Sequence, residues 1–177
     1  MRERLQIVAV LIALGIAGPT HGAHPNLGER ATESFVRAVD ITVMPDGSGL
    51  PAGSGNATKG RSVYLAHCAA CHGATGTGGP NNRLVGGRGT LGSSQPIKTV
   101  GSYWPYATTL FDYVRRAMPY SVPGILSSDE VYSVTAYILH LNGIVGEDAE
   151  LNATSLPGVA MPNRDGFTSA VSGASAP

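Results

Sequence analysis

The sequence predicts an all-α protein in which three helices are joined by long loops rich in glycine and proline. Three segments show apolar residues at helical spacing, and no segment shows a convincing strand pattern. The 24 glycines and 12 prolines among 177 residues indicate that much of the backbone lies outside regular structure. Loops of this length need a large organising group, because three short helices bury little surface among themselves.

The N-terminus has the build of a secretory signal peptide. Arg2 and Arg4 precede an apolar run from Leu5 to about Gly18, which is shorter than the ~20 residues of a bilayer-spanning helix. We therefore predict a signal peptide over residues 1–23 and a periplasmic location, with an uncleaved membrane anchor as the alternative. Twelve basic residues balance twelve acidic ones, so the composition offers no basic face for nucleic acid.

Residues 24–55 are predicted to form an N-terminal extension that wraps the domain. Its first half could hold a short helix within residues 29–40, "ERATESFVRAVD". The second half, "MPDGSGLPAGSG" at residues 44–55, has too much glycine and proline for regular structure.

The three main helices are expected within residues 56–143. The first covers residues 58–70, and the second covers residues 107–117 and is ended by Pro119. The third begins at Ser127, which forms the spacing of a capping box with Glu130. Its apolar positions and its terminal glycine follow at helical spacing: Val131, Val134, Ile138, Leu141 and Gly143. Residues 144–167 then read as a polar C-terminal arm, and residues 168–177 as a disordered tail.

The chemistry of the chain is concentrated in "CAACH", where its two cysteines, Cys68 and Cys71, directly precede His72. A zinc site would need further ligands, and no second pair or histidine spacing supplies them. A thioredoxin-type pair would need a strand-to-helix junction, which the pattern lacks. Haem attachment accounts for all three residues, because two thiols can bond the two vinyl groups while His72 binds the iron. We predict one covalently attached haem c.

The sixth iron ligand must come from elsewhere in the chain. Methionine with histidine suits electron transfer, and Met118, just before Pro119, is the first choice. Met161 is the alternative, and Met44, a histidine or an open site complete the possibilities. Ordinary core packing is the competing explanation for any methionine.

Two further residues are candidate haem contacts. Pro80 keeps a carbonyl that could accept a hydrogen bond from the second ring nitrogen of His72, although it could equally stiffen a loop. Trp104, the single tryptophan, could line the pocket with its N–H near a propionate, or belong to the core. Arg88, Arg115 and Arg116 could face propionates, but surface arginines are commoner.

These residues together resemble a class I cytochrome c. The resemblance rests on Gly60 and Tyr64 before the haem motif, Gly79-Pro80 after it, Met118-Pro119, and a last helix containing Tyr137. It implies that the first and last helices cross near Gly60 and Tyr137, and that Met118 is the distal ligand.

Residues 40–167 also resemble the cytochrome subunits of sulfite-oxidase-type molybdenum enzymes, such as the Sox sulfane dehydrogenase. The stretches concerned include "MPDGSGLPAGSG", "KTVGSYWPYATTLFDYVRRAMPYSVPG" and "MPNRDGF". That subunit typically carries two haem domains, whereas this chain has a single C-x-x-C-H.

The function expected from this resemblance is periplasmic electron transfer. The chain would accept electrons from a molybdenum-containing sulfite or sulfane dehydrogenase and pass them to the respiratory chain. The sequence offers no catalytic residues, so we expect a subunit or partner of an oxidoreductase rather than an enzyme by itself. The alternative is a haem enzyme or ligand-binding cytochrome with an open or displaceable sixth position.

Overall fold

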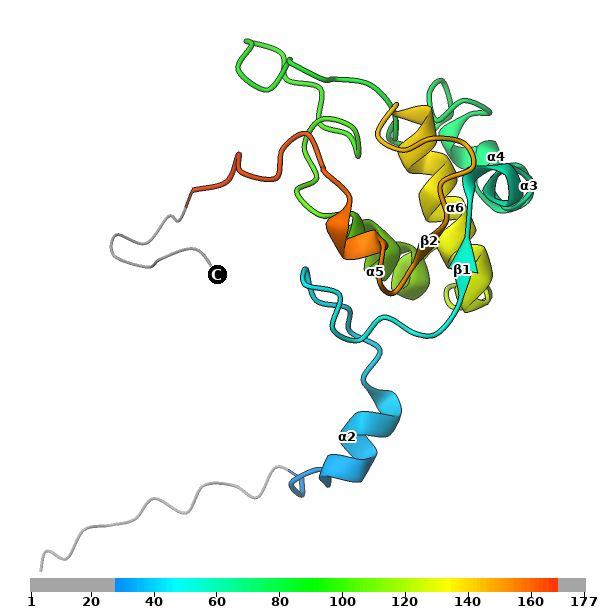
Figure 1. Ribbon diagram of the computed structural model, residues 1–177, viewed down its shortest axis with the longest axis vertical. Helices are drawn as coiled ribbons and strands as arrows, with labels where there is room; N and C mark the ends of the chain where they lie inside the picture. Colours follow the sequence, from blue (N-terminus) through cyan, green and yellow to red (C-terminus); the bar gives the residue numbers. More distant parts are fainter. Residues whose placement is uncertain (1–27, 169–177) are drawn as a thin grey trace, which may run out of the picture. The chain divides into compact units, whose positions relative to one another are not determined.

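The computed structural model describes residues 28–168, and the chain divides into two units between Asp40 and Ile41 (Figure 1). The first unit contains α2, Glu33–Val39, whose N-cap Thr32 accepts a hydrogen bond from the Phe35 amide at 3.2 Å. The predicted signal peptide and nearly all of the predicted tail lie outside the described residues. Among residues 28–168, no helix is both long enough and apolar enough to cross a membrane.

The second unit is mainly helical, which confirms the predicted fold class. Its helices and short elements are α3 (Ala57–His67), α4 (Ala69–His72), α5 (Ala107–Ala117), α6 (Ser128–Leu141), the 3₁₀ turn η1 (Leu156–Gly158) and two strands, β1 (Ser54–Gly55) and β2 (Leu151–Asn152). The predicted bounds of α5 agree with the structure, whereas the first predicted helix is divided in two at Cys68.

Helix α6 forms the centre of this unit. Every residue from Val131 to Leu139 is buried, so the helix is covered on all sides. Its predicted capping box is present: the Ser127 Oγ accepts from the Glu130 amide, and the Glu130 carboxylate accepts from the Ser127 amide at 2.8 Å. The hydrogen bond from the Ser127 hydroxyl to the Glu130 carboxylate, at 2.7 Å, and the one from the Ser127 amide lower the pKa of Glu130.

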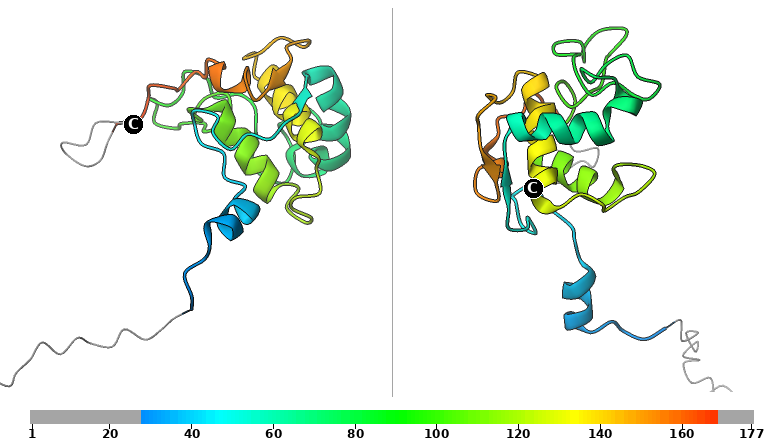
Figure 2. Two further views of the ribbon diagram at one scale, coloured as in Figure 1. Left: turned by 60° about the horizontal axis from the view of Figure 1, so that its bottom comes forward. Right: turned by 90° about the vertical axis from the view of Figure 1, so that its right-hand side faces the viewer.

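Helices α3 and α6 cross in close contact, as Figure 2 shows. Gly60 makes this possible, because a Cβ there would lie 1.9 Å from the Ser133 carbonyl oxygen. Beside it, the rings of Tyr64 and Tyr137 pack at a tilt of 54° with their centroids 5.3 Å apart. The predicted crossing near Gly60 and Tyr137 is confirmed.

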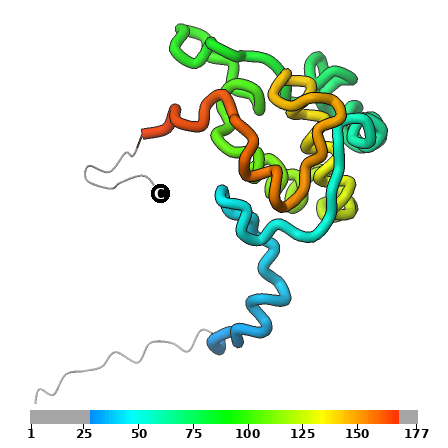
Figure 3. The backbone as a smooth tube through the Cα atoms, viewed as in Figure 1, coloured from blue at the N-terminus to red at the C-terminus, as the bar shows by residue number. Residues whose placement is uncertain are grey.

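Two arms of this unit meet in a small sheet that the sequence did not reveal. Strand β1 pairs antiparallel with β2, with Ser54 opposite Asn152 and Gly55 opposite Leu151. Beyond β2 the chain continues to η1, which packs against α5 (Figure 3). Strands of two residues carry too little alternation to be detected in a sequence, which explains the missed prediction.

Candidate haem site

The two cysteines and His72 lie where α3 ends and the chain turns into α4. Cys68 ends α3, with its amide bonded to the Tyr64 carbonyl at 2.8 Å, and its carbonyl then accepts from the amides of Cys71 and His72. This tight turn makes Cys68 and Cys71 neighbours on one face. Both thiols are free, Cys68 half-buried and Cys71 exposed.

The surroundings of Cys68 do not activate its thiol for disulfide exchange. Burial, together with the neighbouring Cys71, raises the pKa of the Cys68 thiol to about 11. Metal binding and disulfide exchange use a thiolate, whose pKa is normally lowered rather than raised. Among residues 28–168, no cluster of three histidine, cysteine or acidic side chains could hold a metal ion.

The imidazole of His72 is oriented by one hydrogen bond. Its Nδ1 lies 2.8 Å from the carbonyl oxygen of Asn82. A carbonyl oxygen only accepts, so Nδ1 carries the proton and Nε2 keeps a lone pair for a metal. This second partner of a metal-ligating histidine fixes both the tautomer and the ring orientation.

Asn82 takes the place that the sequence analysis gave to Pro80. The loop after the motif folds back onto it, and the Asn81 amide donates to the Cys71 carbonyl at 3.0 Å. A Cβ on Gly79 would lie 2.2 Å from that same carbonyl, so this loop can approach the motif only without a side chain there. The close approach carries the chain past the imidazole and places Asn82 opposite His72, while Pro80 is exposed.

The loop after the motif is tied to the helices at two points. The hydroxyl of Tyr64, which is fully buried, donates to the Gly73 carbonyl at 2.8 Å. Burial raises the pKa of Tyr64 to about 12, so this donor stays protonated. At the end of α6, Asn142 accepts from the Gly86 amide and donates to the Leu84 carbonyl. The role of Asn142 was not predicted from the sequence. Its position before Gly143, at the end of the last helix, was the one available sign that its side chain could bond to neighbouring backbone groups.

The methionine candidates occupy different surroundings. Met118 ends α5, with its amide bonded to the Val114 carbonyl at 3.1 Å, and is partly buried against the core. Met161 is 4% exposed and belongs to the core itself, whereas Met44 is 51% exposed. The assignment of Met118 as a ligand stays a prediction. The alternative assignment to Met161 likewise stays a prediction.

The remaining candidates are placed as follows. Trp104 is partly buried and its ring meets Tyr113 edge to face, with centroids 5.7 Å apart. Arg115 donates to the Ile41 carbonyl and Arg116 pairs with Asp112, so each guanidinium has a partner within the protein. His140 contacts its own helix end, with Nδ1 3.3 Å from the Val145 carbonyl.

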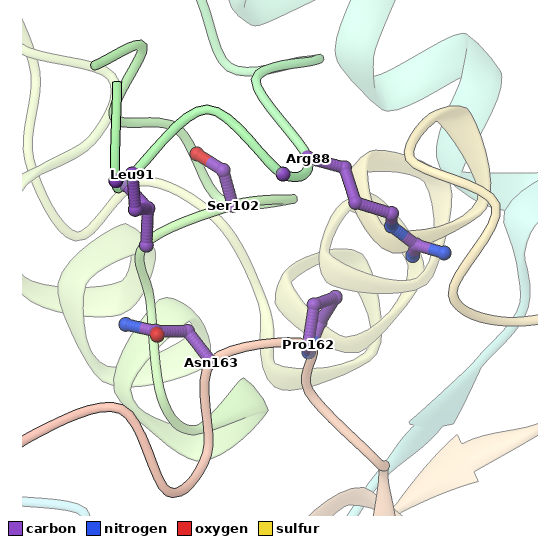
Figure 4. A pocket seen from close by; sticks show the side chains of 7 residues that line it. Arg88, Leu91, Ser102, Pro162 and Asn163 are labelled. Atoms are coloured by element: carbon purple, nitrogen blue, oxygen red, sulfur yellow. The ribbon is translucent and has the colours of Figure 1, made fainter. Parts of the chain in front are cut away.

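Arg88 lines a cavity of about 280 Å³ between the loop before α5 and the C-terminal arm (Figure 4). Leu91 and Ser102 line it from the same loop, and Pro162 and Asn163 from the arm. Within residues 28–168 the Arg88 guanidinium has no hydrogen bond or ion pair. The Asn163 amide is engaged elsewhere, donating to the Tyr103 carbonyl at 2.7 Å.

The fold and this site define a c-type cytochrome: helices that cross at a glycine, two free thiols on one turn, and a histidine whose Nε2 is available for iron. The residues present therefore fit haem c.

Comparison with known proteins agrees with this class. The cytochrome c family model matches residues 57–142. A chain in the crystal structure of the sulfane dehydrogenase SoxCD from Paracoccus pantotrophus is 40% identical, with a TM-score of 0.75. The match covers 82% of this chain and 72% of that one. No curated protein matches the sequence. The chain belongs to the class I cytochrome c family, is an electron-transfer cytochrome, and uses haem c.

Proposed function

We propose that this chain is a periplasmic one-electron carrier for a molybdenum-containing dehydrogenase that oxidises sulfite or sulfane sulfur. It would accept electrons from that enzyme and deliver them to the respiratory chain. One haem would be attached covalently through Cys68 and Cys71, with His72 as the proximal ligand and Met118 as the distal ligand.

The observation that carries the proposal is the extent of the match to the sulfane dehydrogenase chain. The general cytochrome c model covers about half of the sequence, residues 57–142, whereas the structural match covers 82% of the chain. The likeness therefore includes residues of the arms outside the general domain. Such arms are the parts in which cytochromes of different partners are expected to differ.

The residues supply attachment, orientation and shielding. When bound, haem supplies the one-electron couple between ferric and ferrous iron. Cys68 and Cys71 would bind it covalently, and the Asn82 carbonyl, which holds His72 Nδ1, would leave Nε2 available to the iron. Met118 would supply the sixth ligand, which favours electron transfer over ligand chemistry.

Replacing Met118 tests both the ligand and the carrier function. Met118→Ala should abolish the methionine-to-iron absorption band of the oxidised protein and allow carbon monoxide to bind the reduced form. Met161→Ala is the matched control and should keep the band. Loss of the band in the Met161 variant alone would move the ligand to the C-terminal arm. Rapid carbon monoxide binding by the unaltered protein would favour the ligand-binding alternative.

The partner is tested by reconstitution. A sulfite-oxidase-type dehydrogenase encoded beside this gene should reduce the cytochrome when sulfite or another sulfur substrate is added. The cytochrome mixed with the substrate alone, without the dehydrogenase, should stay oxidised. Reduction or substrate turnover by the cytochrome alone would indicate an enzyme. Cell fractionation tests the export. Mass spectrometry of the denatured protein tests the attachment and should show one haem per chain.

A further inference from the structure

The start of the second unit is held on α5 by three side chains of that helix. The Asp112 Oδ1 accepts from the Val43 amide at 3.0 Å, and the Thr108 hydroxyl donates to the Pro45 carbonyl at 3.2 Å. Arg115 donates to the Ile41 carbonyl at 3.2 Å. Residues 41–45, which we call the N-terminal strap, therefore lie against the helix along two of its turns.

Asp112 is the buried acidic side chain among these contacts, and Thr108 is buried beside it. Its residue is 6% exposed, and its second oxygen pairs with Arg116. A buried carboxylate is costly unless its lone pairs are satisfied, so the side chain depends on the Val43 amide as well as on the arginine. Val43 is itself 6% exposed, so the strap is anchored by core packing and by a charge-assisted hydrogen bond.

Two of these contacts, those of Asp112 and Arg115, lie on the turns of α5 that lead directly to Met118. The last helical hydrogen bond of α5 runs from the Met118 amide to the Val114 carbonyl. Asp112 and Arg115 flank Val114 along the helix, so the strap restrains the turn that sets the position of Met118. The Met118 side chain makes no hydrogen bond within residues 28–168 and is only partly buried against the core.

We propose that Asp112 is a positioning residue for the sixth ligand, acting by locking the N-terminal strap onto the last turns of α5. This inference rests on the proposed function, because it takes Met118 to be the ligand. A strap that holds the end of α5 disfavours the open state in which the methionine leaves the iron. By linkage, loosening the strap must make Met118 easier to displace.

The experiment is an imidazole titration of the oxidised, haem-loaded protein, following the methionine-to-iron band. Asp112→Ala should lower the apparent Kd for imidazole by about tenfold, the scale of one lost charge-assisted hydrogen bond. Asp112→Asn keeps an acceptor for the Val43 amide and should give a smaller shift. Hydrogen exchange at residues 41–45 should accelerate in parallel with the imidazole affinity.

Asp129→Ala is the matched control. The Asp129 Oδ1 likewise accepts from a backbone amide of the N-terminal segment, that of Ser54 at 2.8 Å, but Asp129 lies on α6. This variant should leave the imidazole affinity unchanged. If Asp112→Ala does not yield haem-loaded protein, Thr108→Val removes a second strap contact and should shift the affinity in the same direction.

Equal imidazole affinities in the Asp112 and Asp129 variants would overturn the inference, as would faster exchange of the strap without any change in affinity. Persistence of the band in Met118→Ala is a separate result, because it would contradict the assigned ligand. The two failures are therefore distinguishable.

Discussion

At the scale of single residues, the site depends on side chains and carbonyls that orient the chemistry rather than perform it. The Asn82 carbonyl sets the tautomer of His72, and Tyr64 ties the turn of the motif to Gly73. Sequence reasoning found Cys68, Cys71 and His72 because their spacing is dictated by the cofactor. It assigned the carbonyl partner to Pro80, because which backbone carbonyl meets the imidazole depends on how the loop folds.

The Tyr64 hydroxyl gives a residue-scale prediction. Tyr64→Phe should lower the free energy of unfolding by about 1 kcal/mol or somewhat more, because the Gly73 carbonyl loses a buried donor. Denaturant titration of the haem-loaded protein measures it. Tyr137→Phe removes the hydroxyl oxygen from the ring that packs against Tyr64. This variant should change the free energy of unfolding less. A larger loss in the Tyr137 variant would contradict the role given to the Gly73 contact.

At the scale of elements, the helix bounds could be predicted where capping residues or a proline end the helix. They could not be predicted at the haem motif, where the chain turns inside the expected helix. Helix α5 has its expected bounds, and α6 has the capping box read from Ser127 and Glu130. The expected first helix is broken at Cys68, whose φ of −123° and ψ of −37° let the chain turn into α4. The sequence could not show that Asp112 is buried. Its partner Val43 is 69 positions away, and its pairing with Arg116 on the same helix is equally typical of an exposed helix face.

The crossing of α3 and α6 gives the element-scale prediction. Gly60→Ala should destabilise the protein by several kcal/mol, about the upper range for a core substitution, because the Ser133 carbonyl cannot yield without moving α6. Thermal unfolding followed by circular dichroism measures the loss. Gly146→Ala is a control, since a Cβ there meets nothing within 4 Å. A Gly60 variant as stable as this control would show that the helices can separate freely.

At the scale of the whole molecule, the covalent haem is expected to be part of the fold. Between α4 and α5 the chain runs from Gly73 to Tyr106 without a helix or strand, held mainly by turns and a few side-chain bonds. Loops of this length are stable in a compact domain only when something organises them. The two arms add a sheet of just two residues per strand, which is too small to organise this loop without the haem.

Replacing both Cys68 and Cys71 with alanine should therefore remove the haem and, with it, the cooperative thermal transition of the protein. Differential scanning calorimetry measures this, and hydrogen exchange should show residues 73–106 close to the rates of an unfolded chain. Met118→Ala keeps both thiols and His72, so that variant should retain its haem and a cooperative transition at a lower temperature. A colourless double variant with an unchanged transition would mean that the helices and arms alone organise the loop.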